Sequence, residues 1–243
     1  MNTTKECRRY CNFLKLNKIC KRGFLVGSDQ VFRDDYIKRT ADYYLLNFVQ
    51  PNKQRIAISA SFGKDSFNLK NKENSFKAFD TISVREDNAI PICQELGVQA
   101  THILDPVFLA DKNIFEKLTE NIEIPKGLVV GYILDENDDT RKITDPYGKN
   151  FLNIAKMNVS VEEFLAYIKH SDKFITDSFH GTCFAIIFNK QFYTLGNANR
   201  GNSRFESLFK TFNISNNNLD SSVDWNKINN IIEIEKQKDI FWN

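Results

Sequence analysis

The stretch KFITDSFHGTCFAIIF (173–188) has the pattern of a strand that passes through a tight turn directly into a helix. Its apolar start predicts a strand at 173–176, its polar residues 177–181 predict the turn, and the apolar run that follows predicts a buried helix over 181–188. Strand–turn–helix units of this kind build the parallel sheets of α/β proteins. His180, one of only three histidines in the chain, lies in this turn.

The same alternation of strands and helices extends in both directions from this stretch. Apolar runs bounded by Gly, Pro, Asn and Asp predict the strands, and apolar residues at helical spacing predict the helices. The polar, turn-rich segment 135–150 predicts a surface loop, and Ser160 with Glu163 three residues later predicts a capping box. The other predicted strands are 24–26, 42–49, 55–63, 81–84, 100–105, 128–134 and 191–196, and the other predicted helices are 5–20, 86–97, 111–122, 160–171, 203–214 and 224–243.

This order of elements predicts an α/β protein with two Rossmann-like domains, each built on a parallel sheet. A less regular region at 107–125 separates two series of strand–helix units. We therefore expect an N-terminal domain at 1–110 and a C-terminal domain at 111–215. The remaining segment, 216–243, predicts a C-terminal helix that could pack back on the N-terminal domain.

The composition is that of a globular protein without a strong surface charge. The chain has 243 residues and a formal net charge of +2, which gives no reason to expect binding to nucleic acid or to an anionic membrane. No segment approaches the roughly 20 apolar residues that cross a bilayer, and the charged N-terminus does not resemble a signal peptide, so we expect a cytoplasmic protein. An odd number of irregularly spaced cysteines predicts free thiols and no metal site: Cys7, Cys11, Cys20, Cys93 and Cys183.

Ligands of α/β sheets bind beyond the carboxyl ends of the strands, which directs attention to His180. The first N–H groups of a helix lack intrahelical partners and the helix dipole is positive there, so an anion is favoured beside this residue. A bound phosphate or carboxylate would raise the proton affinity of the imidazole and make it a usable general acid. The alternative is a histidine that only caps the helix. For His102 and His170 we expect structural roles.

Polar residues near other predicted element ends leave similar alternatives open. Arg85 follows a predicted strand and could clamp a phosphate or carboxylate, or could pair with its acidic neighbours. Asp29 and Gln30 could bind sugar hydroxyls or cap a helix, and Asp105 could fix a turn. Arg204, at the entry to a predicted helix, could face a cleft or solvent. The chain has no Walker A, G-x-G-x-x-G or G-x-S-x-G motif, so these residues match no common nucleotide or hydrolase site.

Together, the strand ends resemble the polysaccharide pyruvyl transferase family. The similarity runs from about residue 24 to about residue 214, and its specific part is the combination of GSDQV, SVRE and TDSFHG in this order. The segments that carry it are VGSDQVF (26–32), ISASFG (58–63), FDTISVRED (79–87), LDPVFL (104–109), ITDSFHGTCFAIIF (175–188) and RFESLF (204–209).

The resemblance implies a GT-B-like fold, similar to two-domain glycosyltransferases with the active site in the cleft between the domains. It implies transfer of a pyruvyl group from phosphoenolpyruvate to sugar hydroxyls, which forms a cyclic ketal on a surface polysaccharide or its precursor. No cofactor and no metal are implied. The expected partners are phosphoenolpyruvate and a glycan or lipid-linked sugar acceptor, so a cytoplasmic member could work at the inner face of the membrane.

The resemblance also assigns roles to residues of this sequence. It makes His180 the catalytic acid or base. The residues that it places against the donor are Arg85, Ser178, Phe179, Gly181 and Arg204, and those that it places on the acceptor side are Asp29 and Gln30.

The sequence departs from the family pattern in its first and last thirds. It starts just before GSDQV, which implies a missing first strand–helix unit, an N-terminal domain truncated at its start, and a sheet edge that could pair with another copy in a homo-oligomer. Some branches have Arg-Leu-His where this chain has Ser178-Phe179-His180, so a cation for the donor must come from elsewhere. Two alternatives therefore stay open: a GT-B-like glycosyltransferase that uses a nucleotide sugar, and a truncated, inactive member.

Overall fold

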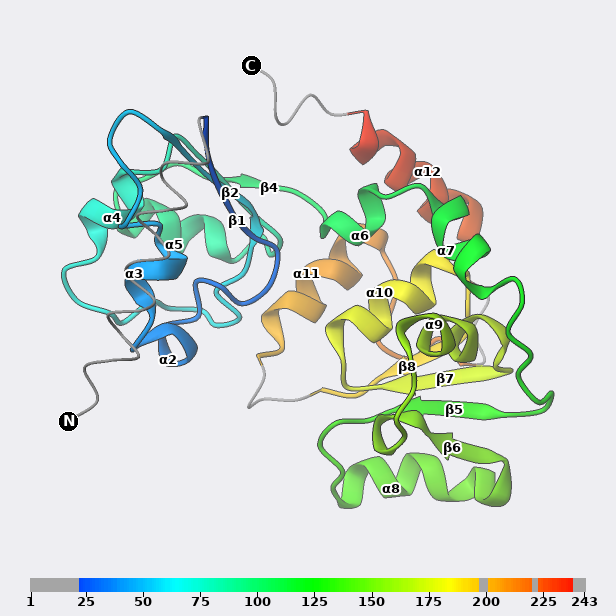
Figure 1. The fold of residues 1–243 in the computed structure, drawn as a ribbon. Coiled ribbons are helices and arrows are strands. Elements are labelled where there is room, and N and C mark those ends of the chain that lie inside the picture. Colours follow the sequence, from blue (N-terminus) through cyan, green and yellow to red (C-terminus); the bar gives the residue numbers. More distant parts are fainter. Residues whose placement is uncertain (1–21, 197–200, 220–222, 238–243) are drawn as a thin grey trace. The chain divides into compact units, whose positions relative to one another are not determined.

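The computed structural model describes residues 22–196, 201–219 and 223–237, and it divides the chain into two compact units (Figure 1). The first unit is Met1–Asp105 and the second is Pro106–Asn243. The predicted helix at 5–20 and the cysteines Cys7, Cys11 and Cys20 lie outside the described residues.

The first unit contains a parallel sheet whose strand order follows the sequence, β1-β2-β3-β4. Because the strands are parallel, all their carboxyl ends lie at the same edge of the sheet, which brings the ends of four separate segments together. The strands are β1 (Gly23–Gly27), β2 (Gln54–Ala60), β3 (Thr81–Val84) and β4 (Thr101–His102), and the helices are α2 (Asp34–Ile37), α3 (Ala41–Tyr44), α4 (Glu73–Lys77) and α5 (Ala89–Glu95).

The core of the first unit is centred on phenylalanine side chains. Phe32 packs edge-on against Phe76 with the ring centroids 5.0 Å apart, and Phe67 packs edge-on against the same ring at 5.2 Å. Phe62 stacks on Phe76 at 5.9 Å, and Phe79 closes the group against Phe32 at 5.8 Å. Edge-to-face contacts of this kind add to the stabilisation that burial of the rings provides.

The second unit contains another parallel sheet, with the order β6-β5-β7-β8. From β5 the chain passes to β6 on one side and then to β7 on the other side of β5. In doubly wound sheets, ligands bind at such a switch point between central strands. The strands are β5 (Val129–Tyr132), β6 (Phe151–Asn153), β7 (Lys173–Thr176) and β8 (Phe192–Thr194). The helices are α6 (Pro106–Leu109), α7 (Lys112–Thr119), α8 (Asp138–Thr144), α9 (Val161–His170), α10 (Phe179–Ile187), α11 (Ser203–Phe212) and α12 (Trp225–Lys236), with short 3₁₀ segments η1 (Asp145–Asn150) and η2 (Ile154–Lys156).

The predicted fold class is confirmed: both units are α/β structures with parallel four-stranded sheets, consistent with two Rossmann-like domains. The strand predicted at 173–176 has the predicted bounds, and the capping box formed by Ser160 and Glu163 is present at the start of α9. The helix after the turn begins at Phe179, two residues earlier than predicted, because Ser178 serves as its N-cap. The C-terminal helix α12 packs on α6 within the second unit.

Two predicted elements are wrong. Segment 42–49 is not a strand: it begins within helix α3 and continues as turns, and Ala41, Leu45 and Val49 are buried at a spacing of four residues. Segment 135–150 is not a loop: it contains α8 and η1, and Asn137 and Thr140 form a capping box that starts α8.

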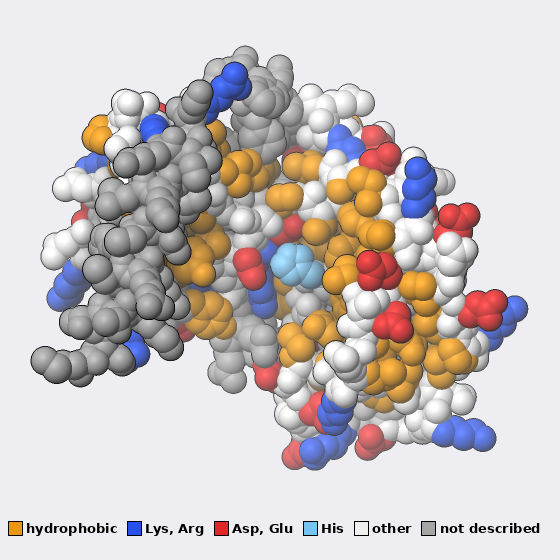
Figure 2. All heavy atoms as spheres, in the orientation of Figure 1, with side chains coloured by type: hydrophobic (Ala, Val, Ile, Leu, Met, Phe, Trp, Pro, Cys, Tyr) orange, Lys and Arg blue, Asp and Glu red, His pale blue; other side chains and the backbone are white. Residues whose placement is uncertain are grey.

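The outer surface around α8 carries paired charges. Arg141 contacts Asp138 at 2.9 Å and Lys142 contacts Asp139 at 2.8 Å, with all four side chains more than half exposed. Figure 2 shows basic and acidic side chains next to one another in the lower part of the view, where α8 lies in Figure 1. Exposed pairs of this kind keep the surface well solvated and contribute little to stability. Among the described residues, none of the helices has the length and apolar character needed to cross a membrane.

Candidate functional site

The turn between β7 and α10 is held by hydrogen bonds that begin with Ser178. The Ser178 hydroxyl accepts a hydrogen bond from the Gly181 backbone N–H at 3.3 Å, as an N-cap does, and its backbone N–H donates to Thr176 Oγ1 at 3.0 Å. The Thr176 hydroxyl in turn donates to the Tyr132 carbonyl of β5 at 2.7 Å. The turn is therefore attached to two adjacent strands, and the start of α10 has a fixed position at the carboxyl edge of the sheet.

Asp177 fixes a second loop at the same edge. Its carboxylate is 2% exposed and accepts hydrogen bonds from the backbone N–H groups of Leu134, at 2.8 Å, and Asp135, at 2.9 Å. These residues follow β5 directly. A buried carboxylate is compensated in this way by charge-assisted hydrogen bonds, so Asp177 is a positioning residue rather than a group that is available to a ligand.

Gly181 is required at its position by a close approach. A Cβ atom there would lie 2.7 Å from Thr176 Oγ1, the hydroxyl that connects the turn to β5. The absence of a side chain lets α10 start directly on top of β7. The predicted contribution of Gly181 to the turn thus has a specific geometric cause.

His180 is the second residue of α10 and is half-buried. Its ring lies edge-on to that of Phe179, with centroids 5.7 Å apart. Phe179 itself is 3% exposed and packs against Phe205 of α11 at 5.9 Å. The Arg204 guanidinium, also from α11, lies 5.6 Å from the Phe179 ring and donates from Nε to the Gly201 carbonyl at 3.3 Å. The structure therefore brings His180 and Arg204 into contact with the same phenylalanine ring.

The packing of Phe179 and Arg204 bears on the roles that the sequence suggested for them. Phe179 is a packing residue that carries the contact between α10 and α11. Arg204 does not face solvent, since it is 7% exposed and its guanidinium also lies over the Phe205 ring at 5.1 Å. An arginine held against aromatic rings is pre-organised, so less side-chain entropy is lost when it binds an anion.

In the first unit, the carboxyl edge of the sheet is organised around Arg85. Its side chain is fully buried, and Nη1 donates to Asp105 Oδ2 and to the Ser28 carbonyl, each at 3.0 Å. Nη2 donates to Asp29 Oδ1 at 3.2 Å, and Nε lies 3.8 Å from Glu86 Oε2. Arg85 thus joins segments that follow β1, β3 and β4, and this favours the ion-pair alternative that the sequence left open.

Glu86 extends this network to the end of β2. It is completely buried, and its Oε1 accepts three hydrogen bonds: from the Ser61 hydroxyl at 2.8 Å, the Phe62 N–H at 2.7 Å and the Gly63 N–H at 3.0 Å. Sequence reasoning treated Glu86 only as a neighbour of Arg85. Its place directly after a buried strand was the signal that could have identified it.

The charged members of this network differ in burial, and their charges act on the pKa of Arg85. Burial alone would lower the pKa of the Arg85 guanidinium, but the carboxylates of Glu86, Asp105 and Asp29 raise it above its ordinary value. Asp29 is the exposed member, with 71% of its side chain accessible. Since one guanidinium faces three carboxylates, the edge of the first unit favours hydroxyl groups as ligands more than a phosphate.

Gln30 lies next to this network. Its backbone N–H donates to Asp29 Oδ1 at 2.8 Å, and its side-chain oxygen accepts from Arg33 Nη1 at 3.3 Å. The side chain fills the space beside Gly63, where a Cβ atom would collide with its amide. Gln30 is 8% exposed, so it supports Asp29 more than it presents a surface of its own.

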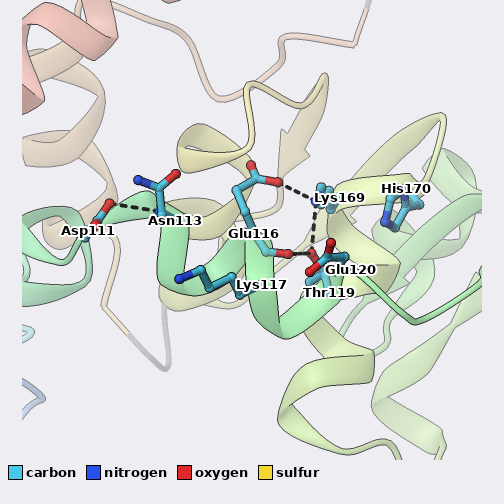
Figure 3. A pocket seen from close by; sticks show the side chains of 8 residues that line it. All are labelled: Asp111, Asn113, Glu116, Lys117, Thr119, Glu120, Lys169 and His170. Atoms are coloured by element: carbon cyan, nitrogen blue, oxygen red, sulfur yellow. Dashed lines mark hydrogen bonds and ion pairs between the residues drawn. The ribbon is translucent and has the colours of Figure 1, made fainter.

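A large hollow of about 670 Å³ lies elsewhere in the second unit, between α7 and α9 (Figure 3). One lining residue is His170, which the sequence predicted to be structural. Another is Lys169, whose ammonium contacts Glu116 and donates to the Thr119 hydroxyl. His170 ends α9 shortly before β7 begins, so this part of the hollow lies at the amino edge of the sheet. Ligands of α/β sheets bind at the opposite edge, where His180 lies.

The fold and these two polar strand edges define the class of the protein: an α/β protein built from two Rossmann-like units. The particular family follows from comparison with known proteins. The family model described as polysaccharide pyruvyl transferase matches residues 2–199, and the chain belongs to this family of transferases. A search of the curated proteins finds no match.

Proposed function

We propose that this protein transfers a pyruvyl group from phosphoenolpyruvate to two hydroxyl groups of a sugar, on a surface polysaccharide or its precursor. The observation that carries the proposal is the position of His180 at the start of α10, fixed by the Ser178 cap and next to Phe179, against which Arg204 also packs. Family membership supports the reaction class, and the helix N-terminus together with Arg204 offers the positive potential that a phosphorylated carboxylic acid needs.

The proposed reaction begins with proton transfer from the His180 imidazolium to the methylene carbon of phosphoenolpyruvate. The adjacent carbon then becomes an oxocarbenium-like electrophile, to which one sugar hydroxyl adds with loss of its proton. The proton of the first hydroxyl returns to His180. The bond from this carbon to the phosphate oxygen then breaks, and the second hydroxyl adds to the same carbon to close the ketal, while its proton goes to the departing phosphate. His180 acts as general acid, and Arg204 stabilises the negative charge of the donor.

Arg85 has a different place in this proposal from the one that the resemblance implied. Its guanidinium already pairs with three carboxylates, so we assign it to the positioning of Asp29. Asp29 and Gln30 form the part of the first unit that would meet acceptor hydroxyls, with the Asp29 carboxylate as their hydrogen-bond acceptor. Some branches of the family have an arginine at the position of Ser178. In this chain Arg204, from α11, would supply the cation for the donor instead.

The acceptor would be a glycan or a lipid-linked sugar, and a lipid-linked acceptor would require the protein to work at the inner face of the membrane.

The test combines donor binding with turnover. Calorimetry should detect binding of phosphoenolpyruvate at millimolar concentration, and phosphate release should depend on a glycan acceptor. His180→Ala should reduce phosphate release by at least 100-fold with an unchanged unfolding midpoint, because general acid catalysis contributes about that much or more. His170→Ala is the matched control, and it should retain activity.

The alternatives give different results in the same experiments. Stronger stabilisation by UDP or GDP than by phosphoenolpyruvate would overturn the proposal in favour of a nucleotide-sugar glycosyltransferase. Absence of binding to any of these donors would identify an inactive member of the family.

A further inference from the structure

A separate hollow of about 350 Å³ lies at the carboxyl end of β8 in the second unit. It is lined by Thr194 and Gly196 at the end of β8, by Asn202, the N-cap of α11, and by Glu206 and Phe209 of α11. These three side chains lie three or four residues apart, so they share one face of the helix. The volume is at the lower end of the range for ligand pockets, about 300–1,000 Å³.

Ser215 and Asn216 also line the hollow, and backbone hydrogen bonds hold their segment in place. Asn216 accepts a hydrogen bond from the Thr194 backbone N–H through its carbonyl at 2.7 Å, and its side-chain amide donates to the Thr194 carbonyl at 3.4 Å. The Asn218 backbone N–H donates to the Phe192 carbonyl at 2.8 Å, so segment 216–218 runs along the edge of β8. The asparagine run that the sequence marked only as a break therefore places the Asn216 amide beside the hollow.

The chemistry of the lining selects the kind of ligand. Glu206 is exposed and is the only ionisable side chain in the described lining, which contains no Lys, Arg or His. Among the described lining residues, a phosphate or carboxylate would meet only the negative charge of Glu206, so these residues favour an uncharged ligand. Phe209 stacks on Phe205 at 6.3 Å and on Phe192 at 6.4 Å but is only half-buried, so the rest of its ring is accessible next to amide and carboxylate groups.

A pyranose ring has the complementary chemistry. Its C–H groups form an apolar face that packs on an aromatic ring, and its hydroxyls can donate to a carboxylate and accept from an amide. The hollow also lies beside the turn of His180. The hydroxyls of Thr182 in α10 and Thr194 are 2.9 Å apart, and Phe205 contacts both Phe209 and Phe179, the residue before His180.

We propose that this hollow at the end of β8 binds one uncharged pyranose ring of the saccharide acceptor. The identity of the ligand as an acceptor rests on the proposed function, whereas binding of a pyranose rests on the lining alone. The site recognises the ring by stacking on Phe209 and by hydrogen bonds to Glu206, Asn202 and Asn216. It gives the second unit a saccharide-binding role in addition to the one proposed for Asp29 in the first unit.

The full chain is titrated with methyl glycosides of glucose, galactose, mannose and N-acetylglucosamine, and binding of each glycoside is measured by saturation-transfer NMR. At least one should bind, and Glu206→Gln and Phe209→Leu should each weaken its binding by about tenfold. Both variants should bind phosphoenolpyruvate within twofold of the wild type. Glu95→Gln, an exposed change on α5, is the control and should alter neither ligand.

Each outcome decides the proposal. It is overturned if none of the glycosides binds, if the Glu206 and Phe209 variants bind them like the wild type, or if uridine or guanosine displaces the bound glycoside. Unfolding midpoints identify a variant that has lost its fold, and in that case Asn216→Ala provides the same comparison. Glycoside binding without phosphoenolpyruvate binding would support the hollow while it refutes the proposed transfer reaction.

Discussion

Replacement of Arg85 by methionine should lower the free energy of unfolding of the first unit by about 3–5 kcal/mol, the cost of removing one partner from a buried ion pair. The magnitude follows from the burial of the partners that remain. The Asp105 carboxylate, 3.0 Å from Nη1, is 1% exposed, and that of Glu86, 3.8 Å from Nε, is 0% exposed. Asp29 is 71% exposed, so water can replace its contact and it adds little to the loss.

The assay is urea unfolding followed by far-UV circular dichroism, with hydrogen exchange of β2 and β3 to locate the effect in the first unit. Arg141→Met is the matched control, since it removes the same group from an exposed pair with Asp138 and should have no measurable cost. Equal stability of the Arg85 and Arg141 variants at pH 7.5 would refute this reasoning.

The turn and the buried thiol give further predictions. Gly181→Ala should cost about 1–3 kcal/mol of stability in urea unfolding, because the new Cβ would lie 2.7 Å from Thr176 Oγ1 in a packed turn, and a neutral result would show that α10 can shift freely. Asp177→Asn should accelerate hydrogen exchange at the two backbone N–H groups that follow β5, by loss of charge-assisted hydrogen bonds, and unchanged protection there would contradict the assigned role. Burial, reinforced by Glu86, raises the pKa of the Cys93 thiol to about 12, so the thiolate is scarce at pH 8 and increases only as the pH approaches 12. Peptide mapping should therefore show modification of Cys93 by a thiol reagent at pH 8 only after unfolding, and rapid labelling of the native protein would disagree.

The fold class could be predicted because the central strands are apolar and their ends are polar. The strand at 173–176 is confirmed. It was predictable because the apolar run stops at Asp177, a residue that the interior of a strand would not accommodate. The capping box of α9 was predictable for a similar reason, since Ser160 and Glu163 have a spacing that is specific to helix starts.

The wrong elements have physical causes. Segment 42–49 is rich in aromatic residues, which favour strands, but Ala41, Leu45 and Val49 repeat every four residues, and this spacing was the better signal. Helix α8 buries Thr140 and Thr144 instead of apolar residues, so its periodicity is hidden in a polar sequence.

The candidate site could be predicted in its residues but not in its pairings. Arg85 and Asp105 lie 20 positions apart, and only the parallel pairing of β3 with β4 brings them to 3.0 Å. The sequence therefore could not decide between a ligand clamp and an ion pair for Arg85. It also could not place Arg204 beside Phe179, because that contact depends on how α11 packs on α10.

The phenylalanine core of the first unit has a practical consequence for spectroscopy. The only tryptophans of the chain, Trp225 and Trp242, lie in the sequence of the second unit, and none occurs in residues 1–105. Intrinsic tryptophan fluorescence should therefore follow the second unit alone, while the rings packed around Phe76 leave the unfolding of the first unit invisible to it. Phe79→Trp would give the first unit its own fluorophore at the margin of that aromatic group, and the two transitions could then be recorded separately.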